Sequence, residues 1–449
     1  MTHRFRFTCT RLLPACALAA LLAGPPGFAP SANAADITYP GSSLDKSPLW
    51  QAINDCLFPA GSLSDNKVTI NSGNVSGDVY GNDVDAAFSP VSNNTVILSG
   101  GSVGGDILGG ANNGAVTGNK VSISGFGSVL GSVYGGYGAA EGTVNGNDVS
   151  IFDSGSVTGN VLGGYSRSVN SHVIGNTVTI SGGTVRDIYG GQSGKGNALN
   201  NSVTLDGAAS QANVIYGGRV EQGTARENAV VMKNGNVALG IFGGIATADG
   251  GQAQDNHVTM SGGSVGEHLI GGYVQNGNGE ASGNSVTFNG GSVTNNIYGG
   301  MSAAGLAQSN SVIMTNGSAN WLLGGYSDSG DVSGNSVNVS GGTLTGVSGG
   351  ESNSGSATGN IVSISGGTVQ SNVNGGFVAS GSGKATGNIV NISGNADLSG
   401  AVVVGGSSPD GDAFTGNTLN KNSDAAVKVA RNFASVNFNY SGNANIGGL

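Results

Sequence analysis

The chain has 449 residues, of which 85 are glycine and only 9% are charged, and its formal net charge is −10. This composition argues against disorder, because disordered chains are rich in charge, and against helical bundles, because each helical glycine costs about 1 kcal/mol. It also argues against a nucleic-acid partner, which would need a basic surface, and it favours a repetitive protein rich in strands and turns.

Residues 1–34 have the features of a Sec signal peptide. Three arginines and a short apolar core precede the motif Ala32-Asn33-Ala34, so we expect cleavage between Ala34 and Ala35. The apolar core is too short to span a bilayer, and no later segment reaches about 18 apolar residues. We therefore expect an exported chain with no transmembrane segment of its own.

Residues 35–60 are expected to cap the first coil of the structure. The stretch from Ser47 to Leu57 predicts a short amphipathic helix, with Ser47 as its N-cap and Pro48 at its first position. Its expected task is to cover the open end of the array that follows.

Residues 61–420 form one array of similar units. Each unit has the signature Asn-x-Val-x-Ile, a glycine-rich turn, and an apolar pair before Gly-Gly, and the units are about 27 residues long. Such a period is typical of solenoids. The anchor asparagines are Asn66, Asn94, Asn119, Asn147, Asn176, Asn201, Asn228, Asn256, Asn284, Asn310, Asn335, Asn360, Asn388 and Asn417.

The pattern inside a unit is that of strands. In residues 176–191, Val178 and Ile180 alternate with threonines, and a second apolar segment lies between two Gly-Gly turns. A polar stretch of variable length follows, as is usual for loops. The sequence therefore predicts an all-β fold, a single parallel β-helix of about 14 coils.

The columns of this array have different expected roles. The Val and Ile columns should point inward and form the core, each side chain contributing about 1.5–3 kcal/mol. The asparagine column should stack at a bend, each amide bonding the next along the axis, because a buried amide needs partners. The glycines should provide the left-handed backbone conformations of the corners.

A further column precedes Gly-Gly and is rich in aromatic residues. Two interpretations stay open: an outward stripe that binds a ligand, or packing at a corner or under the variable loop. The stripe ends before Ser348 and Asn374. Its candidate residues are Tyr134, Tyr189, Tyr216, Phe242 and Tyr298.

Residues 421–449 lose the repeat but keep strand character in 427–430 and 433–438. We expect a C-terminal strand segment that belongs to a truncated or split chain, because an open coil edge would be exposed there.

No motif for catalysis, a cofactor or a metal is found, and His257 and His268 lack companion ligands. One alternative is a carbohydrate-active β-helix enzyme, a polysaccharide lyase or hydrolase. Its charged candidates are Arg186, Lys195, Arg219, Arg226 and Lys233, with Asp187, Asp206, Glu221 and Glu227. A remote alternative is an ice-binding solenoid with the outward residues Thr69, Thr179, Thr204, Thr259 and Thr287, a column that Val231 and Asn338 interrupt.

The units GNTVTISGGTV (175–185) and GNIVSISGGTV (359–369), and the tail VARNFASVNFNYSGN (429–443), resemble Gram-negative autotransporter passenger domains. The resemblance covers about 61–443. It implies a β-helix displayed outside the cell, often as an adhesin, and translocated by a C-terminal outer-membrane β-barrel. No barrel strands are recognisable here, so we expect a separate or missing barrel.

We therefore expect an exported structural or adhesive passenger module without catalysis. Its expected partners are host or matrix glycans or proteins. With a barrel it would reach the cell surface, the outer membrane or the medium, and without one it would stay in the periplasm.

Overall fold

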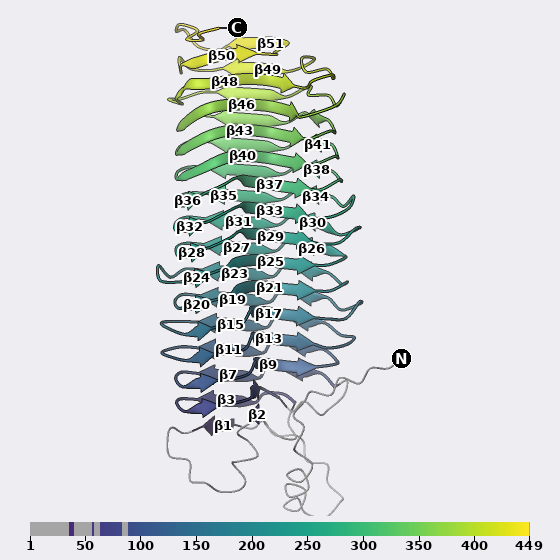
Figure 1. The fold of residues 1–449 in the computed structure, drawn as a ribbon, viewed down its shortest axis with the longest axis vertical. Coiled ribbons are helices and arrows are strands. Elements are labelled where there is room, and N and C mark those ends of the chain that lie inside the picture. Colours follow the sequence, from purple (N-terminus) through teal and green to yellow (C-terminus); the bar gives the residue numbers. More distant parts are fainter. Residues whose placement is uncertain (1–35, 40–55, 58–62, 83–88, 449) are drawn as a thin grey trace, which may run out of the picture.

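The computed structural model of the protein describes residues 36–39, 56–57, 63–82 and 89–448, and every regular element in these ranges is a β-strand. The strands stack in parallel and form a long rod (Figure 1). The rod has about 13 turns of about 27 residues, which confirms the all-β parallel solenoid. This agrees with the expected number of about 14 coils, since fourteen anchor asparagines enclose thirteen intervals.

The predicted signal peptide, its cleavage site at Ala34 and Ala35, and most of the cap (35–60) lie outside the described residues. Two short strands are described in the cap: β1 (Asp36–Tyr39) pairs with β3 (Lys67–Ile70), and β2 (Cys56–Leu57) pairs with β5 (Asp78–Tyr80). The helix prediction for 47–57 is therefore wrong for its last two residues. The unpaired backbone groups at the edge of β5 favour strand pairing there.

Three parallel sheets form the sides of the rod. The 16-stranded sheet contains β1 and β3, then β7 (Thr95–Leu98), β11 (Lys120–Ile123), β15 (Asp148–Ile151), β19 (Thr177–Ile180), β23 (Ser202–Leu205), β27 (Ala229–Met232), β31 (His257–Met260), β35 (Ser285–Phe288), β39 (Ser311–Met314), β42 (Ser336–Val339), β45 (Ile361–Ile364), β47 (Ile389–Ile392), β49 (Thr418–Lys421) and β51 (Ser435–Phe438).

The 24-stranded sheet has a row of short strands and a row of long ones. The short strands are β4 (Asn74–Val75), β8 (Ser102–Val103), β12 (Ser128–Val129), β16 (Ser156–Val157), β20 (Thr184–Val185), β24 (Gln211–Ala212), β28 (Asn236–Val237), β32 (Ser264–Val265) and β36 (Ser292–Val293). The long row contains β2 and β5, then β9 (Ile107–Asn112), β13 (Val133–Gly138), β17 (Val161–Ser166), β21 (Asp187–Ser193), β25 (Val214–Val220), β29 (Ile241–Ala246), β33 (Leu269–Val274), β37 (Ile297–Ser302), β40 (Ser318–Ser327), β43 (Thr343–Ser352), β46 (Thr368–Val378), β48 (Leu398–Ser407) and β50 (Val427–Arg431). From β40 onward the two rows join into single strands.

The 11-stranded sheet consists of strands of two or three residues. They are β6 (Val91–Ser92), β10 (Val116–Thr117), β14 (Val144–Asn145), β18 (Val173–Ile174), β22 (Ala198–Leu199), β26 (Thr224–Arg226), β30 (Gln252–Gln254), β34 (Ala281–Ser282), β38 (Ala307–Gln308), β41 (Val332–Ser333) and β44 (Ala357–Thr358). The variable loops of the repeat lead into these strands.

The core of the rod is a continuous aliphatic stack. In the coil that begins at β19, Val178, Ile180, Val185 and Ile188 are all buried, and their equivalents in neighbouring coils extend the same cluster. Register explains this continuity, because Val178 pairs with Val203 and Ile180 with Leu205. The apolar residues that alternate with polar ones in the sequence are therefore the side chains on the inward face of each strand.

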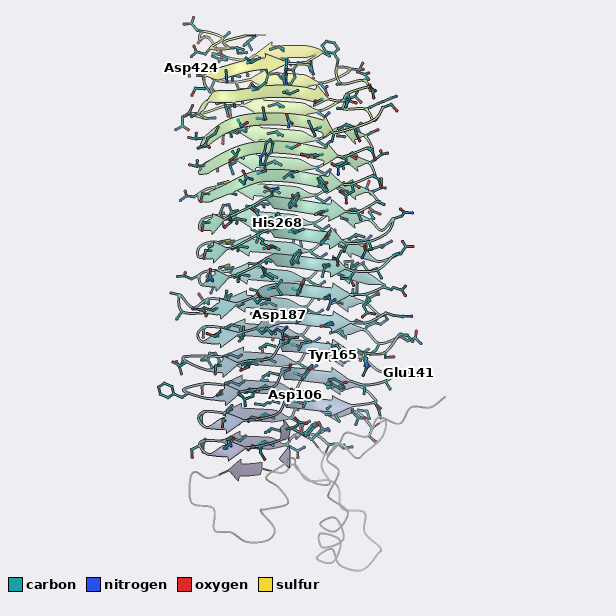
Figure 2. All side chains as sticks on the ribbon, in the orientation of Figure 1. Asp106, Glu141, Tyr165, Asp187, His268 and Asp424 are labelled. Carbon is teal, nitrogen blue, oxygen red and sulfur yellow. The ribbon has the colours of Figure 1, made fainter. Side chains whose placement is uncertain are left out.

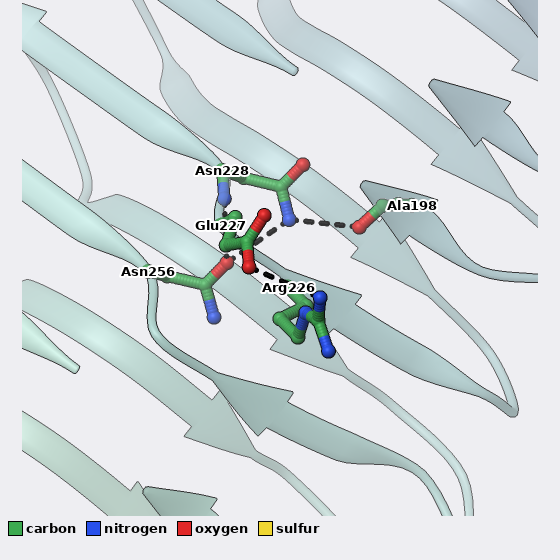
Figure 3. A network of polar contacts seen from close by, with 5 residues as sticks. All are labelled: Ala198, Arg226, Glu227, Asn228 and Asn256. Atoms are coloured by element: carbon green, nitrogen blue, oxygen red, sulfur yellow. Dashed lines mark hydrogen bonds and ion pairs between the residues drawn. The ribbon is translucent and has the colours of Figure 1, made fainter. Parts of the chain in front are cut away.

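The fourteen anchor asparagines form an unbroken ladder along the interior. In each pair the side-chain amide donates a hydrogen bond to the amide oxygen of the next coil, over 2.7 to 3.2 Å. Figure 3 shows one link: the amide of Asn228 donates to Asn256 and also to the carbonyl oxygen of Ala198. The ladder therefore satisfies its buried amides and ties the 11-stranded sheet to the interior.

The Gly-Gly pairs have a different task from the one predicted. Glycines at other corners have positive φ, but those of the Gly-Gly pair before each loop, such as Gly217 and Gly218, do not. A Cβ on Gly218 would lie 2.4 Å from the amide of Asn228. The second glycine is thus needed because the ladder occupies the space of a side chain.

The residue before each ladder asparagine does adopt the left-handed conformation. It is glycine in eight coils, as at Gly359 (φ 64°), and another residue in six, as at Asn200 (φ 55°) and Glu227 (φ 55°). This position turns the chain from the 11-stranded to the 16-stranded sheet.

The last described residues continue the solenoid. Strand β50 pairs with β48 and β51 pairs with β49, so the predicted strands in 421–449 are present. Lys421 takes the buried core position that Ile392 has in the coil before, and its amino group donates to the carbonyl oxygen of Ser423.

Candidate ligand-binding face and pocket

Three columns of side chains run along the outer face of the 24-stranded sheet. Outer column 2 is the residue directly before Gly-Gly, outer column 3 is the residue directly after it, and outer column 1 lies two residues before outer column 2. Register places each member next to its equivalent in the neighbouring coil. Figure 2 shows Asp106, Asp187 and His268 of outer column 1 along one line of the rod, with Tyr165 of outer column 3 beside them.

The aromatic stripe of the sequence analysis is outer column 2. Its residues lie outside the main core, whereas the residues before them, such as Ile188 and Ile215, belong to it. The stripe thus faces away from the core, yet Tyr189 and Tyr298 are only 7% and 9% exposed. The side chains of neighbouring coils cover the rings, as Tyr216 does beside Tyr189 and Ile270 and Leu323 do beside Tyr298.

The rings of neighbouring coils stack along the rod. The ring centroids of Tyr189 and Tyr216 are 5.0 Å apart with an interplanar angle of 16°, and those of Tyr216 and Phe242 are 5.1 Å apart at 17°. These separations are close to the spacing of adjacent strands, about 4.8 Å. Register alone therefore builds a stacked aromatic surface.

Outer column 3 supplies a second aromatic row that the sequence analysis did not identify. Its aromatic members are Tyr137, Tyr165, Tyr273, Tyr326 and Phe377, and other coils place Gln192, Arg219, Ile245, Met301 and Glu351 in the same column. The two rows touch across the Gly-Gly pair, where the centroids of Tyr134 and Tyr137 are 5.4 Å apart. Comparing the residues that follow each Gly-Gly would have revealed this row.

The tyrosine hydroxyl groups of this face remain protonated over the physiological pH range. Burial raises the pKa of Tyr134 and of Tyr189 to about 12. Their hydroxyl groups are therefore hydrogen-bond donors as well as acceptors.

A pocket with a volume of about 360 Å³ opens on this face beside β37, β40, β43 and β46. It is lined by Asn296, Tyr298, Trp321, Leu323, Tyr326, Glu351, Asn372, Asn374 and Phe377. The hollow arises because β43 contributes only Gly346 to outer column 1 and Ser348 to outer column 2. The end of the aromatic stripe in the sequence is thus the place where the pocket forms.

Trp321 forms one wall of the pocket and depends on Gly346. The two residues pair in register, and a Cβ on Gly346 would lie 2.5 to 2.6 Å from three atoms of the indole ring. The ring therefore lies over the backbone of the next coil. The absence of a side chain at residue 346 determines where this wall stands.

Glu351 brings an acidic group into the pocket, between Tyr326 and Phe377 of outer column 3. Burial raises the pKa of its carboxyl group to about 7. Among the described residues, no hydrogen bond or ion pair to this carboxyl group is found. The neighbouring Tyr326 is fixed instead, because its hydroxyl donates to Asp328 over 2.8 Å and accepts from the amide of Asn353 over 2.9 Å.

The basic residues proposed for an enzyme are not gathered in one cleft. Arg219 lies on β25 of the 24-stranded sheet and Arg226 on β26 of the 11-stranded sheet, while Lys233 follows β27 of the 16-stranded sheet. Arg226 pairs with Glu227 at 3.0 Å, as Figure 3 shows, and Lys233 pairs with Asp206 at 2.7 Å. The three basic side chains therefore belong to three different sheets of the rod.

The remaining candidates are also separated. His257 lies on the 16-stranded sheet, whereas His268 lies on the outer face of the 24-stranded sheet, 5.7 Å from the ring of Tyr298. No cluster of three metal-ligating side chains occurs in the part of the chain that the structure describes. The threonine column keeps the predicted register and is interrupted, with Val231 between Thr204 and Thr259.

No family model, no curated protein and no solved structure matches the chain. Within the described ranges, no helix capable of crossing a lipid bilayer is present.

Proposed function

We propose that the chain is an exported structural and adhesive module whose 24-stranded sheet presents its outer face to carbohydrate. The observation that carries the proposal is the stack of Tyr189, Tyr216 and Phe242 in outer column 2, with further aromatic residues of outer column 3 in other coils. The signal-peptide features and the resemblance to autotransporter passenger repeats support export and display, and a β-solenoid fold is compatible with such a passenger.

The chemistry of the face suits sugars. The outer edges of the stacked rings and the half-buried rings of outer column 3 offer apolar contacts to the C–H groups of pyranose rings, and the phenol and amide groups beside them pair with sugar hydroxyls. Sites of this kind combine apolar walls with a few polar groups. Because the rings of Tyr189, Tyr216 and Phe242 follow one another at about strand spacing, a glycan chain along the rod would touch these three coils and gain avidity from contacts that are weak individually.

A carbohydrate-active enzyme is the second candidate, and Glu351 is the observation in its favour. A carboxyl group with a pKa of about 7 has the properties of a general acid. However, Glu351 is the sole carboxyl group that lines the pocket, whereas glycoside hydrolysis uses two. This candidate predicts new reducing ends or unsaturated ends after incubation with acidic polysaccharides, lost in Glu351→Gln.

The adhesive proposal is tested with the purified chain from Ala35 onward on a glycan array. The double variant Tyr216→Ala/Phe242→Ala should bind at least about tenfold more weakly, because it removes the centre of the stack. Thr259→Ala on the 16-stranded sheet is the matched control and should bind normally, with thermal melting to verify folding. Binding to no glycan, or equal binding by both variants, would contradict the proposal. External-protease treatment of intact cells tests display.

A further inference from the structure

We infer that the pocket around Glu351 binds a small organic cation, an alkylated or primary ammonium group, with the carboxylate as its counter-ion and aromatic rings as its walls. This inference goes beyond the proposed function, since stacking of neutral sugars on the aromatic rows requires no charge. It also concerns other coils than the stack of Tyr189, Tyr216 and Phe242.

The first argument is the lack of compensation for Glu351. A carboxylate removed from water needs hydrogen bonds or a cation to stay ionised. In the described part of the chain neither reaches Glu351, and desolvation is the one cause of its raised pKa. Glu351 lines the pocket, so a cation that enters the pocket would supply the missing partner.

The second argument is the nature of the walls. Tyr326 and Phe377 flank Glu351 in register, at the spacing of adjacent strands, and Trp321, in outer column 1 of the coil before, forms another wall of the same pocket. Aromatic faces carry negative potential and attract ammonium groups, most strongly in the case of tryptophan. A carboxylate among such rings is the arrangement that recognises alkylated ammonium groups.

The third argument is charge selection and size. Apart from Glu351, every group that lines the pocket is neutral or aromatic, including the amides of Asn296, Asn372 and Asn374. The pocket therefore repels anions. A volume of about 360 Å³ leaves room for the molecule that carries the ammonium group.

The groups around Glu351 also determine how binding of the cation should depend on pH. Tyr298 on β37 and Tyr326 on β40 face Glu351, and burial raises the pKa of both, so they stay neutral. Asp328, after β40, accepts the hydroxyl of Tyr326 and is not part of the pocket lining, and the lining residues from β46 do not titrate. Because the cation binds ionised Glu351, its affinity should fall at least about tenfold between about pH 8 and pH 5.

The test uses the chain's own fluorescence. The sequence has two tryptophans, so Trp50→Phe leaves Trp321 as the one tryptophan reporter in the pocket wall. Choline is titrated against its neutral isostere 3,3-dimethylbutan-1-ol, and glucosamine against neutral N-acetylglucosamine. These pairs separate charge from shape, and they distinguish an alkylated ammonium from an amino sugar.

Choline or glucosamine should change the emission and bind at least about tenfold more tightly than its neutral counterpart. Glu351→Gln should remove this preference, while Glu141→Gln, an exposed control, should retain it. Glycan binding through Tyr216 and Phe242 should persist in Glu351→Gln, so the two proposals can fail separately. Equal affinity for cation and isostere, or a preference unchanged in Glu351→Gln, would overturn the inference. An affinity for the cation that does not vary with pH in the protein with Glu351 intact would overturn it without any pocket variant.

Discussion

The interior of the rod and the outer face of the 24-stranded sheet follow different rules, although the same coils supply both. Inside, asparagine occupies the ladder position in every coil from Asn66 to Asn417. Outside, outer column 2 changes from Tyr298 to Leu323, Ser348 and Asn374 within four coils. A buried amide needs an identical partner above and below it, whereas an outward side chain needs only space. Stability therefore rests on residues that repeat, and specificity on residues that do not.

The largest expected effect comes from breaking the ladder. Asn228→Ala removes the hydrogen bonds to Asn256 and Ala198 and leaves the backbone and side-chain N–H groups of Asn201 without their acceptor. We expect a loss of about 3–5 kcal/mol in the free energy of unfolding, because buried donors are left unpaired. Chemical denaturation followed by circular dichroism measures it.

The matched control is Asn391→Ala on the outside of the 16-stranded sheet. Asn391 also makes axial bonds, donating to Ser363 and accepting from Asn420, but it is half-buried. The expected loss is below about 1 kcal/mol, since water replaces the lost bonds. Equal losses in the two variants would contradict the distinction between interior and exterior.

The next effect concerns the acid on the outer face. Because burial raises the pKa of Glu351 to about 7 in the folded state, that state favours the protonated acid. Burial of Glu351 costs no stability below the unfolded-state pKa near 4.3, where the carboxyl group is protonated in both states. Above about pH 7 it destabilises the folded state by its full amount. Glu351→Gln should thus melt like the parent protein at about pH 4 and be more stable by about 2 kcal/mol at pH 8. A constant difference across this range would refute the assignment.

The smallest effect concerns the corner before the ladder. Gly359 has φ 64°, and a Cβ built there would meet nothing within 4 Å. Gly359→Ala should therefore cost about 1 kcal/mol from backbone conformation alone, whereas Gly359→Asn should cost less, because asparagine tolerates this conformation. Asn200 already occupies the equivalent corner of another coil. Thermal melting of the two variants checks the order.

The sequence predicted the repeating part of the molecule well, for a physical reason. Valine alternation in 176–180 and the spacing of the asparagines express contacts that recur in every coil, so a periodic pattern is enough to find them. The cap was harder. The helix expected over 47–57 rested on local amphipathicity, while the pairing of Cys56 and Leu57 with β5 depends on an edge supplied by a later segment.

The pocket was not predicted, because its residues come from different coils. Trp321, Gly346 and Glu351 are unremarkable in their own units, and loops of variable length hide the register that joins them. Aligning the units on Gly-Gly would have placed Trp321 next to Gly346. It would not have shown that Glu351 is half-buried, which depends on the rings around it.

The residue before each ladder asparagine has the same backbone conformation in every coil, so whole coils can be inserted or deleted as units. Deleting 228–255 would bring Glu227 directly in front of Asn256, where Asp255 now stands with a similar φ of 54°. The same hydrogen bonds would re-form, and the rod would be shorter by one strand spacing, about 4.8 Å. Gene duplication or loss of whole coils can therefore lengthen or shorten the protein in fixed steps. The distance of the pocket from the N-terminal end of the rod can thus evolve while the residues that line the pocket stay the same.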